Sequence, residues 1–362
     1  MKKFTAILTA ILMVTALMTA CSSTTQSSTS SSQTSSESSS SQTDSEEKIK
    51  IVTTIFPVYD WVKSILGDEI DNVELTMLLE TGVDLHSYEP TTTDIVTILD
   101  SDLFIYIGGE SDTWVADIMQ NNDTEDINVV SLFDILGDDV KAEELVDGME
   151  HEHEEEEETD EEEHDHDDEE ETDEEEHDHD DEEEESDEHV WLSLVNAEKI
   201  CYAITELLGE IDSENATVYT ENNDAYVAQL DALNTQFEET VESSTVNTLL
   251  FADRFPFRYF VDDYDLEYFA AFAGCSTETE ASFDTIIFLA EKVNELDLSY
   301  VLVIDGSDCT IADTVVSSTT DQDQEILTLN SMQSTTIQDV ENGDTYLSVM
   351  EENLVVLQQA LS

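Results

Sequence analysis

The sequence predicts an α/β protein with two Rossmann-like lobes, a central cleft and one long rigid helix that joins the lobes. Two series of short apolar runs, rich in β-branched and aromatic residues, alternate with segments of helical periodicity, as βα units require. Between the two series, residues 213–243 contain neither Gly nor Pro. An acidic, histidine-rich tract interrupts the first series and offers almost nothing apolar to bury, so we expect a disordered loop inserted in the N-terminal lobe.

The N-terminal lobe is expected over residues 48–212. Apolar runs at 49–55, 73–79 and 103–107 predict its strands, and each is followed by a stretch with helical spacing. The linking helix is expected over residues 213–244. Its apolar positions recur at roughly helical spacing: Val218, Ala225, Leu230, Leu233, Phe237 and Val241.

The C-terminal lobe is expected over residues 245–362, with strands at 248–252, 266–272, 300–304 and 325–329. In open α/β sheets, ligands bind beyond the carboxyl ends of the strands. We therefore expect a binding site in the cleft between the two lobes.

The amino terminus indicates export. Lys2 and Lys3 precede an apolar stretch at 4–18 that is short for a membrane span, so residues 1–20 are interpreted as a signal peptide. Residues 17–21, Leu-Met-Thr-Ala-Cys, resemble a bacterial lipoprotein cleavage box, although Met18 stands where leucine is more usual. Cys21 would then carry lipid, and the Ser/Thr-rich residues 21–47 would form a flexible tether to the cell membrane. A signal peptide cut elsewhere is the alternative.

The charge balance excludes one class of partner. Ten Lys and Arg residues face ninety Asp and Glu residues. Phosphate binding needs a basic surface, so nucleic acid is not expected as a partner. Divalent cations are the natural complement to such acidity, although acidic residues also serve solubility.

The predicted insertion at 143–188 gathers histidine. Seven of the eight histidines of the chain fall between positions 151 and 189, and thirty of the forty residues at 150–189 are Asp or Glu. Residues 159–171 repeat identically as 172–184. The paired histidines are His151 and His153, His164 and His166, and His177 and His179. His-rich acidic tracts favour metal capture, and a plain solvated linker is the alternative interpretation.

Four segments carry a family resemblance. Residues 53–61 (TTIFPVYDW), 82–90 (GVDLHSYEP), 103–110 (LFIYIGGE) and 187–192 (DEHVWL) resemble motifs of the metal-binding lipoproteins that serve ABC importers of zinc and manganese. The ending at 346–357 also fits. The resemblance spans nearly the whole mature chain, and a His-rich acidic insertion is typical of the zinc-specific members.

The resemblance implies a monomeric binding protein rather than an enzyme. It would hold one divalent ion in the cleft, with His86 and His189 as ligands, and deliver that ion to an ABC permease. Zinc is favoured because of the histidine tract. Manganese is the alternative, since a cleft richer in carboxylates would suit its preference for oxygen ligands.

The third and fourth ligand positions depart from the family pattern. Arg254 stands where the family usually has a histidine, and a guanidinium has no lone pair to offer a metal. Asn330 stands where the family has an aspartate. We expect either that carboxylates complete the site, from the candidates Glu110, Asp253 and Asp305, or that the acidic tract lends a histidine. In the first case, Arg254 would orient a carboxylate ligand through a charge-assisted hydrogen bond.

Three cysteines remain besides Cys21: Cys201, Cys275 and Cys309. Cys275 and Cys309 follow neighbouring predicted strands, so a disulfide between them is one hypothesis in an oxidising compartment. Zinc thiolate ligation is the alternative, although no Cys-x-x-Cys motif supports it.

The chain has no His-Glu-x-x-His, no Gly-x-Ser-x-Gly and no cysteine with a partnered histidine in a known catalytic motif, so an enzyme is not expected. A surface adhesin or an extracellular zinc buffer is compatible with the same features. Binding to a permease would separate an importer component from a buffer.

Overall fold

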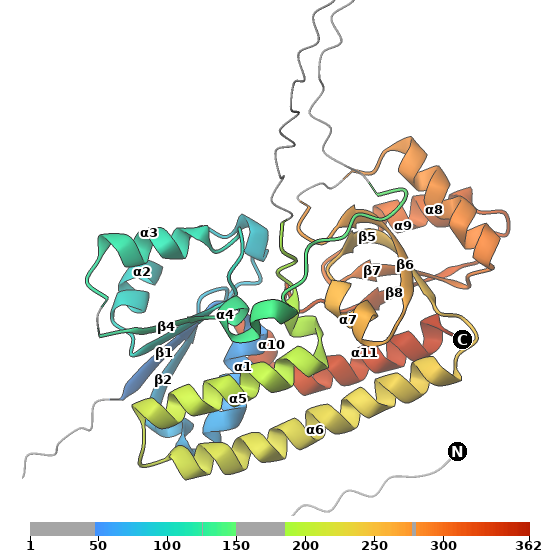
Figure 1. Cartoon of the computed structure of the whole chain (residues 1–362). Helices are drawn as coiled ribbons and strands as arrows, with labels where there is room; N and C mark the ends of the chain where they lie inside the picture. The colour runs from blue at the N-terminus through green and yellow to red at the C-terminus, as the bar shows by residue number, and fades with distance from the viewer. Residues whose placement is uncertain (1–47, 125, 150–184, 277–279) are drawn as a thin grey trace, which may run out of the picture. The chain divides into compact units, whose positions relative to one another are not determined.

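The computed structural model describes residues 48–124, 126–149, 185–276 and 280–362 (Figure 1). The predicted signal peptide, the tether, the lipid-bearing Cys21 and the six paired histidines of the tract lie outside these residues. Among the described residues, no helix is both long and apolar enough to cross a membrane.

The first sheet contains four parallel strands in the order β2-β1-β3-β4. Three of them, β1 (Ile49–Thr53), β2 (Val73–Met77) and β3 (Leu103–Tyr106), are the strands that the apolar runs predict. The fourth, β4 (Asn128–Ser131), was not predicted. It has four residues with only two apolar side chains, and it lies at the sheet edge, where little burial is needed.

Helices connect and cover these strands: α1 (Phe56–Leu66), α2 (Thr92–Leu99), α3 (Thr113–Asn121), α4 (Leu132–Leu136) and α5 (Leu194–Ile211), with short 3₁₀ turns η1 (Gly67–Asn72), η2 (Leu85–Ser87), η3 (Gly137–Asp139) and η4 (Val190–Leu192). Local chemistry sets several of their ends. Thr91 and Asp94 form a capping box at the start of α2, and Pro57 stands in the first turn of α1. Side-chain caps thus mark the starts of α2, α4 and α5, whereas α1 and α3 begin without one.

The second sheet repeats the topology of the first. Its parallel strands β5 (Thr248–Phe255), β6 (Glu267–Ala273), β7 (Tyr300–Ile304) and β8 (Glu325–Leu329) have the order β6-β5-β7-β8. The register between β5 and β6 shifts between Phe251 and Arg254, which marks a bulge near the carboxyl end of β5. The helices of this lobe are α7 (Arg258–Asp263), α8 (Phe283–Leu296), α9 (Thr310–Ser318), α10 (Ile337–Asn342) and α11 (Tyr346–Ala360).

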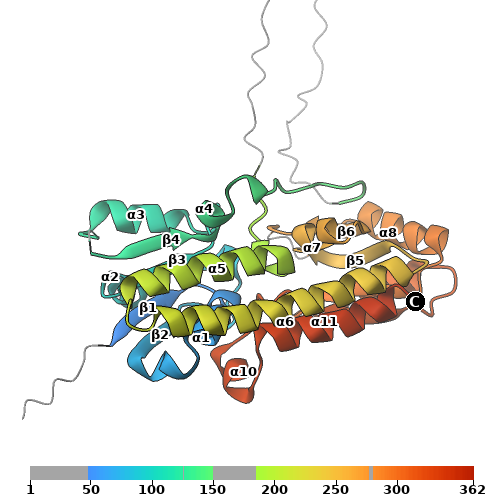
Figure 2. The ribbon, with the colours of Figure 1, turned by 60° about the horizontal axis from the view of Figure 1, so that its bottom comes forward.

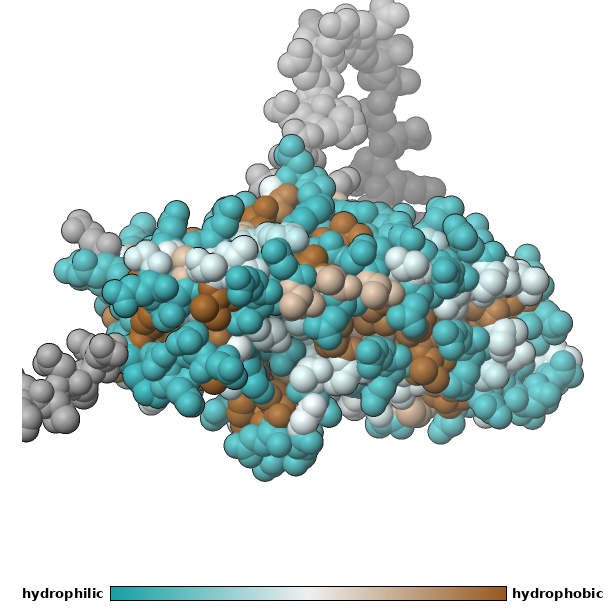
Figure 3. All heavy atoms as spheres, turned by 90° about the horizontal axis from the view of Figure 1, so that it is seen from below, coloured by the Kyte–Doolittle hydropathy of each residue, from teal (hydrophilic) through white to brown (hydrophobic). Residues whose placement is uncertain are grey.

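The predicted long helix is α6 (Ala216–Ser243), which connects the two sheets. It packs against α1, α5 and α11, and it runs along both lobes (Figure 2). One stripe of the helix is buried at intervals of three or four residues: Tyr219, Asn223, Tyr226, Val227, Leu230, Leu233 and Phe237. Seen from below, hydrophilic residues surround several separate apolar patches, as the acidic composition leads one to expect (Figure 3).

The two ends of the predicted insertion lie side by side. Ala142 and Ser186 form an antiparallel bridge, and the N–H of Glu143 donates to the carbonyl of Glu185 at 2.8 Å. We call the described residues 140–149 and 185–188 the tract base. The base contacts the C-terminal lobe, because the N–H of Lys141 donates to the hydroxyl of Tyr259 at 3.0 Å. The base of the insertion, which was predicted to belong to the N-terminal lobe, thus also contacts the C-terminal lobe.

Candidate metal centre

The same short motif holds both predicted histidine ligands. His86 lies in η2, after β2, and His189 immediately precedes η4. In each case an aspartate two residues earlier accepts a hydrogen bond from the histidine backbone N–H: Asp84 Oδ1 from His86 at 3.0 Å, and Asp187 Oδ1 from His189 at 2.8 Å. This Asx-type turn fixes the backbone at each histidine.

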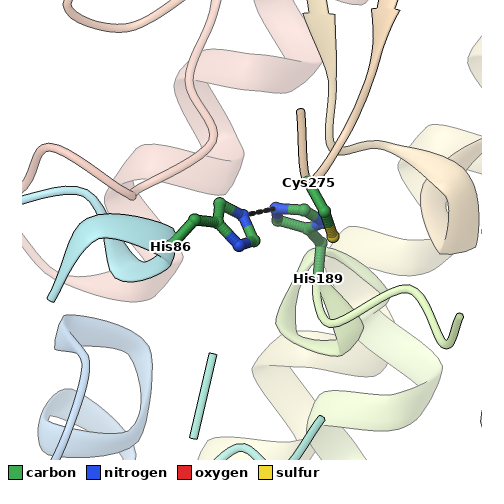
Figure 4. A group of neighbouring side chains, drawn as sticks. All are labelled: His86, His189 and Cys275. Carbon is green, nitrogen blue, oxygen red and sulfur yellow. Dashed lines mark hydrogen bonds between the residues drawn. The ribbon is translucent and has the colours of Figure 1, made fainter. Parts of the chain in front are cut away.

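The two imidazoles face each other. Nε2 of His86 lies 3.3 Å from Nε2 of His189, and the ring centroids are 5.3 Å apart (Figure 4). The His189 side chain is fully buried, and the His86 side chain is 6% exposed. Two segments separated by about a hundred positions in the sequence therefore bring two metal-binding atoms together away from bulk water.

The partners of the other ring nitrogens favour tautomers that leave both Nε2 atoms with a lone pair. Nδ1 of His189 lies 3.0 Å from Asp187 Oδ1, a carboxylate oxygen that can only accept a hydrogen bond from a protonated Nδ1. Nδ1 of His86 lies 2.9 Å from the Ser111 hydroxyl and 3.4 Å from Glu188 Oε2. Carboxylates in this position fix the orientation and raise the basicity of a metal-binding imidazole. Two facing lone pairs define a site for a cation.

Glu188 supplies negative charge beside His86. Burial raises the pKa of Glu188, but hydrogen bonds from His86 and Ser111 outweigh this effect and lower the pKa below its ordinary value. The N–H of Ser111 donates to Glu188 Oε1 at 2.8 Å. Gly109 makes room for this carboxylate, because a Cβ at its φ of +86° would lie 2.5 Å from Glu188 Oε1.

Cys275 is the third residue of the group. One nitrogen of each imidazole and the Cys275 sulfur all lie within 4.8 Å of one another. In the described part of the chain, this is the only set of three or more His, Cys, Asp or Glu residues whose ligand atoms gather in this way. Figure 4 shows Cys275 beside the His189 ring. From the sequence, zinc ligation by a cysteine thiolate is only an alternative, and no motif singles out Cys275.

The three carboxylates expected as ligands do not join this group. Glu110 is exposed. Asp253 accepts hydrogen bonds from the backbone N–H of Arg254 at 2.8 Å and of Ile304 at 3.4 Å. Asp305 accepts from the backbone and hydroxyl of Ser331 and of Ser334, which organises the loop after β8. Both aspartates accept hydrogen bonds from backbone N–H groups near the carboxyl ends of strands. A sequence pattern does not show whether an aspartate at such a position accepts hydrogen bonds or binds a metal.

Arg254 pairs with a carboxylate, but that carboxylate is not in the metal-binding group. Its Nη2 lies 2.7 Å from Asp84 Oδ2, and the other oxygen of Asp84 holds the His86 backbone. Burial raises the pKa of Asp84, and the hydrogen bond and charge of Arg254 more than compensate, so the pKa is lowered. Arg254 therefore acts on the turn that carries His86, and the pair links the C-terminal sheet to the N-terminal lobe.

The altered fourth position also has a structural task. The N–H of Asn330 donates to the side chain of Asn353 at 2.8 Å, and its own side chain accepts from the N–H of Met332 at 2.8 Å. The side-chain oxygen of Asn330 is therefore already engaged within the loop after β8. Asn330 connects the loop after β8 to α11.

The disulfide hypothesis is not supported. Cys201, Cys275 and Cys309 are all free thiols. Burial raises the pKa of the Cys275 thiol, and the charges of Asp187, Glu143 and Glu188 raise it further. Cys275 is therefore a protonated thiol next to two imidazoles unless a cation displaces its proton.

An acidic cavity of about 560 Å³ adjoins this centre. Its lining includes Asp84 and Ser87 from the η2 region, together with Asp253, Arg254 and Asp305 from the C-terminal lobe. The cavity thus lies at the carboxyl ends of the second sheet, in the place where open α/β sheets bind ligands. The carboxylates that line the cavity outnumber its one arginine, so the lining carries a net negative charge.

Two of the residues that were not predicted share a signal that the sequence contains. Asp84 and Asp187 both belong to an Asp-x-His triplet, and the repetition of this triplet at the two predicted ligands indicates a common turn. Cys275 carries a weaker signal, because it follows a predicted strand at the expected cleft edge. Ser111 and Glu188 have no local pattern that sets them apart from other polar residues.

Two similar α/β lobes joined by a long helix, with a buried pair of facing histidines, define a metal-binding protein of the solute-binding class. The particular family follows from comparison: the family described as zinc-uptake complex component A, periplasmic, matches residues 51–360, and the chain belongs to it. Members of this family are extracytoplasmic solute-binding components of zinc uptake systems and not enzymes.

Named relatives agree with this assignment. The chain is 31% identical over 315 residues to the zinc-binding lipoprotein AdcA of Streptococcus pneumoniae serotype 4, a match that covers 87% of this chain and 56% of AdcA. It thus spans about half the length of that relative. It is 27% identical over 315 residues to the high-affinity zinc uptake system protein ZnuA of Bacillus subtilis, covering 87% of this chain and 88% of ZnuA.

Solved structures show the same two-lobed fold. The Zn(II)-bound ZnuA-like domain of S. pneumoniae AdcA superposes with a TM-score of 0.64 at 25% identity, covering 87% of this chain and 99% of that domain. The Zn(II)-bound E280Q variant of S. pneumoniae AdcAII gives a TM-score of 0.66 at 26% identity, covering the same shares.

Proposed function

We propose that this protein captures a zinc ion between His86 and His189, outside the cytoplasm, and passes it to the permease of an ABC importer. The observation that carries the proposal is the separation of 3.3 Å between the two Nε2 atoms. Two imidazoles bound to one tetrahedral zinc at about 2.0–2.1 Å have nitrogens about 3.3–3.4 Å apart. The pair is therefore spaced as two zinc ligands are.

Zinc is favoured over manganese by the donor atoms. Two imidazole nitrogens and one sulfur are the potential ligand atoms at the centre, and harder oxygen donors would be needed to favour Mn²⁺. Asp253 and Asp305, the oxygen donors of the adjoining cavity, already accept hydrogen bonds from the protein. Relatives that are described as zinc-binding or zinc-bound support the same choice.

The proposal includes the attachment of the protein. Lipid on Cys21 would hold it at the membrane surface, where the family's permeases lie, and it would act as a monomer. The lipoprotein name of the pneumococcal relative supports the anchor. The match covers 56% of that relative. The proposal therefore uses only the properties of the matched region and not the activity of the whole relative.

Calorimetric titration of the purified chain with zinc, with manganese as competitor, tests this proposal. We expect one tight zinc site that is lost in His86→Ala and in His189→Ala. His179→Ala, which removes a histidine of the acidic tract, is the matched control and should keep the tight site. If the tight site survives in both cleft variants, the proposed centre is wrong.

The transport step needs its own experiment. Cells that carry the His86→Ala form as their only copy should take up zinc more slowly when zinc is scarce than cells with the wild-type form. Equal uptake, despite loss of the tight site in vitro, would favour a zinc buffer over an importer component.

A further inference from the structure

We infer that Cys275 is a ligand of the captured ion and supplies, as a thiolate, the third donor that Arg254 cannot provide. This inference rests on the proposed function and deepens it. It assigns the centre an N₂S donor set, and hence a preference for thiophilic d¹⁰ cations such as Zn²⁺ and Cd²⁺ over Mn²⁺.

The topology places Cys275 where a ligand is expected. The two sheets have the same strand order, so β6 in the second corresponds to β2 in the first. His86 lies in the connection that follows β2, and Cys275 comes two residues after β6. Corresponding connections of the two lobes therefore meet at the same centre, and each brings one donor.

Close packing fixes the cysteine segment against His189. A Cβ at Gly274 would lie 2.8 Å from the Phe255 carbonyl and 3.0 Å from Cε1 of His189. The backbone at Gly274 thus approaches the imidazole more closely than any other residue type allows. The N–H of Cys275 donates to Glu143 Oε1 of the tract base at 3.0 Å, which holds the other side of the segment.

The distances suit ligation after a small adjustment. Zinc bonds of about 2.3 Å to sulfur and about 2.0–2.1 Å to nitrogen place the two donor atoms about 3.6 Å apart in a tetrahedron. The group of one nitrogen from each histidine and the Cys275 sulfur is already within 4.8 Å. A shift of about 1 Å, which lies within a change of the cysteine side-chain rotamer, closes the difference. On binding, the thiol proton is released to solvent and the sulfur–zinc bond replaces the S–H bond.

Cobalt substitution tests this ligand in the full chain. Co²⁺ bound by a thiolate gives a near-ultraviolet sulfur-to-metal charge-transfer band, which nitrogen and oxygen ligands do not produce. The acidic tract can compete for Co²⁺, but it contains no cysteine and therefore cannot produce this band. The reduced protein is titrated with Co²⁺ until the spectrum no longer changes.

We expect the band in the wild type and in Cys309→Ser, and its loss in Cys275→Ser. Cys309 is the matched control because it is also a half-buried free thiol in the same lobe. The zinc affinity of Cys275→Ser should fall at least about tenfold, since even loss of a partner behind a ligand costs that much. A wild type without the band, or a Cys275→Ser variant that keeps it, would overturn the inference.

Failure of the inference can be told from failure of the proposed function. If His86→Ala loses the tight zinc site but the wild type shows no sulfur band, the site exists and Cys275 is not its ligand. If His86→Ala leaves tight zinc binding unchanged, the centre itself is wrong.

A measurement on the unmodified protein covers the case in which Cys275→Ser does not fold. Alkylation of Cys275 should slow at least about tenfold when zinc is bound, whereas alkylation of Cys309 should not change, as followed by mass spectrometry of the two peptides. Equal rates for Cys275 with and without zinc would refute ligation.

Discussion

At the scale of single residues, carboxylates set the geometry of the histidine pair without joining the group that could bind the ion. Asp84 and Asp187 fix the backbones of His86 and His189, and Asp187 also holds one imidazole nitrogen. Arg254 then stabilises Asp84 in its charged form. The arginine that replaces a family histidine thus supports the site indirectly.

Removing this support should weaken zinc binding without abolishing it. Arg254→Gln leaves Asp84 without its cation, so the η2 turn should hold His86 less firmly. We expect zinc affinity to fall by about 10- to 100-fold, which is the usual effect of removing a group that orients a metal ligand. Calorimetry on Arg254→Gln, with Arg258→Gln as the control at the chain's other arginine, measures the effect. An unchanged affinity in Arg254→Gln would show that the ion pair is only a link between the lobes.

A buried carboxyl near His86 makes the stability of the protein depend on pH. Asp112 is buried, and its Oδ2 accepts hydrogen bonds from the N–H groups of Ile107 and Gly108. Its Oδ1 has no hydrogen-bond partner among the described residues. Burial raises the pKa of Asp112 to about 6, and the charge of Glu188 adds to this effect. The folded state therefore binds the proton more tightly than the unfolded state, and this contribution to stability is lost as pH rises through about 6.

Asp112→Asn should therefore be more stable than the wild type at pH 8 and gain clearly less at pH 4.5, where the carboxyl of the folded wild type is mostly protonated. A shift of roughly two pKa units corresponds to about 3 kcal/mol, which is the upper range of the expected gain. Urea unfolding at both pH values, with a chelator present so that bound metal does not contribute, measures it. A gain that is as large at pH 4.5 as at pH 8 would contradict the assignment.

At the scale of elements, α6 is the part of the fold that the sequence defines most directly. Its length follows from the absence of Gly and Pro, and helical spacing correctly marks Leu230, Leu233 and Phe237 as buried. Val218 and Ala225, which the same spacing includes, are exposed. The strand β4 is the opposite case, because four residues carry too little pattern to be recognised. The bulge in β5 also has no local signal, although it lies beside Arg254 and Asp253.

Substitutions in the buried stripe of α6 should lower the free energy of unfolding rather than the affinity for zinc. Leu230 is fully buried, so Leu230→Ala should lower the free energy of unfolding by about 2–5 kcal/mol. Val218 on the same helix is 37% exposed, and Val218→Ala should cost far less. Urea unfolding compares the two variants, and equal losses would contradict the assigned helix face.

At the scale of the whole molecule, several contacts tie the two sheets together around the centre. The tract base reaches the C-terminal lobe through Lys141 and Glu143, and the Trp191 indole donates to the Ser331 carbonyl at 2.9 Å. The Arg254–Asp84 pair adds a third link. Glu143 of the tract base thus contacts the segment that carries Cys275.

Deleting residues 150–184 should lower the number of zinc ions that the protein binds without changing the affinity of the tight site. The ends of the deletion lie in the tract base, where Glu143 and Glu185 are already hydrogen-bonded, so the fold should tolerate it. We expect loss of several weakly bound zinc ions and retention of the tight one, because His86, His189 and Cys275 remain. Zinc titration by calorimetry distinguishes this outcome from loss of the tight ion, which would mean that the tract lends a ligand.

Zinc capture as a whole should fail as pH falls toward 5. Imidazole must be neutral to bind a metal, and an ordinary histidine titrates near pH 6.5, so protons compete increasingly with zinc below that value. Zinc affinity measured between pH 7.5 and 5 should therefore decrease steeply. An affinity that does not change over this range would count against a histidine centre.

The two-lobed α/β class and the long helix could be predicted from the sequence, and side-chain chemistry alone excludes Arg254 as a ligand. His86 and His189 stay predicted ligands. These conclusions follow from local periodicity, from short motifs and from the chemistry of single side chains. Only the tertiary structure decided which other groups meet the histidines. It assigned Asp253 and Asp305 to backbone hydrogen bonds, gave Arg254 a partner in Asp84 and brought Cys275 beside His189. The reason is physical: these partners are far apart in sequence, and their meeting depends on how the two sheets pack.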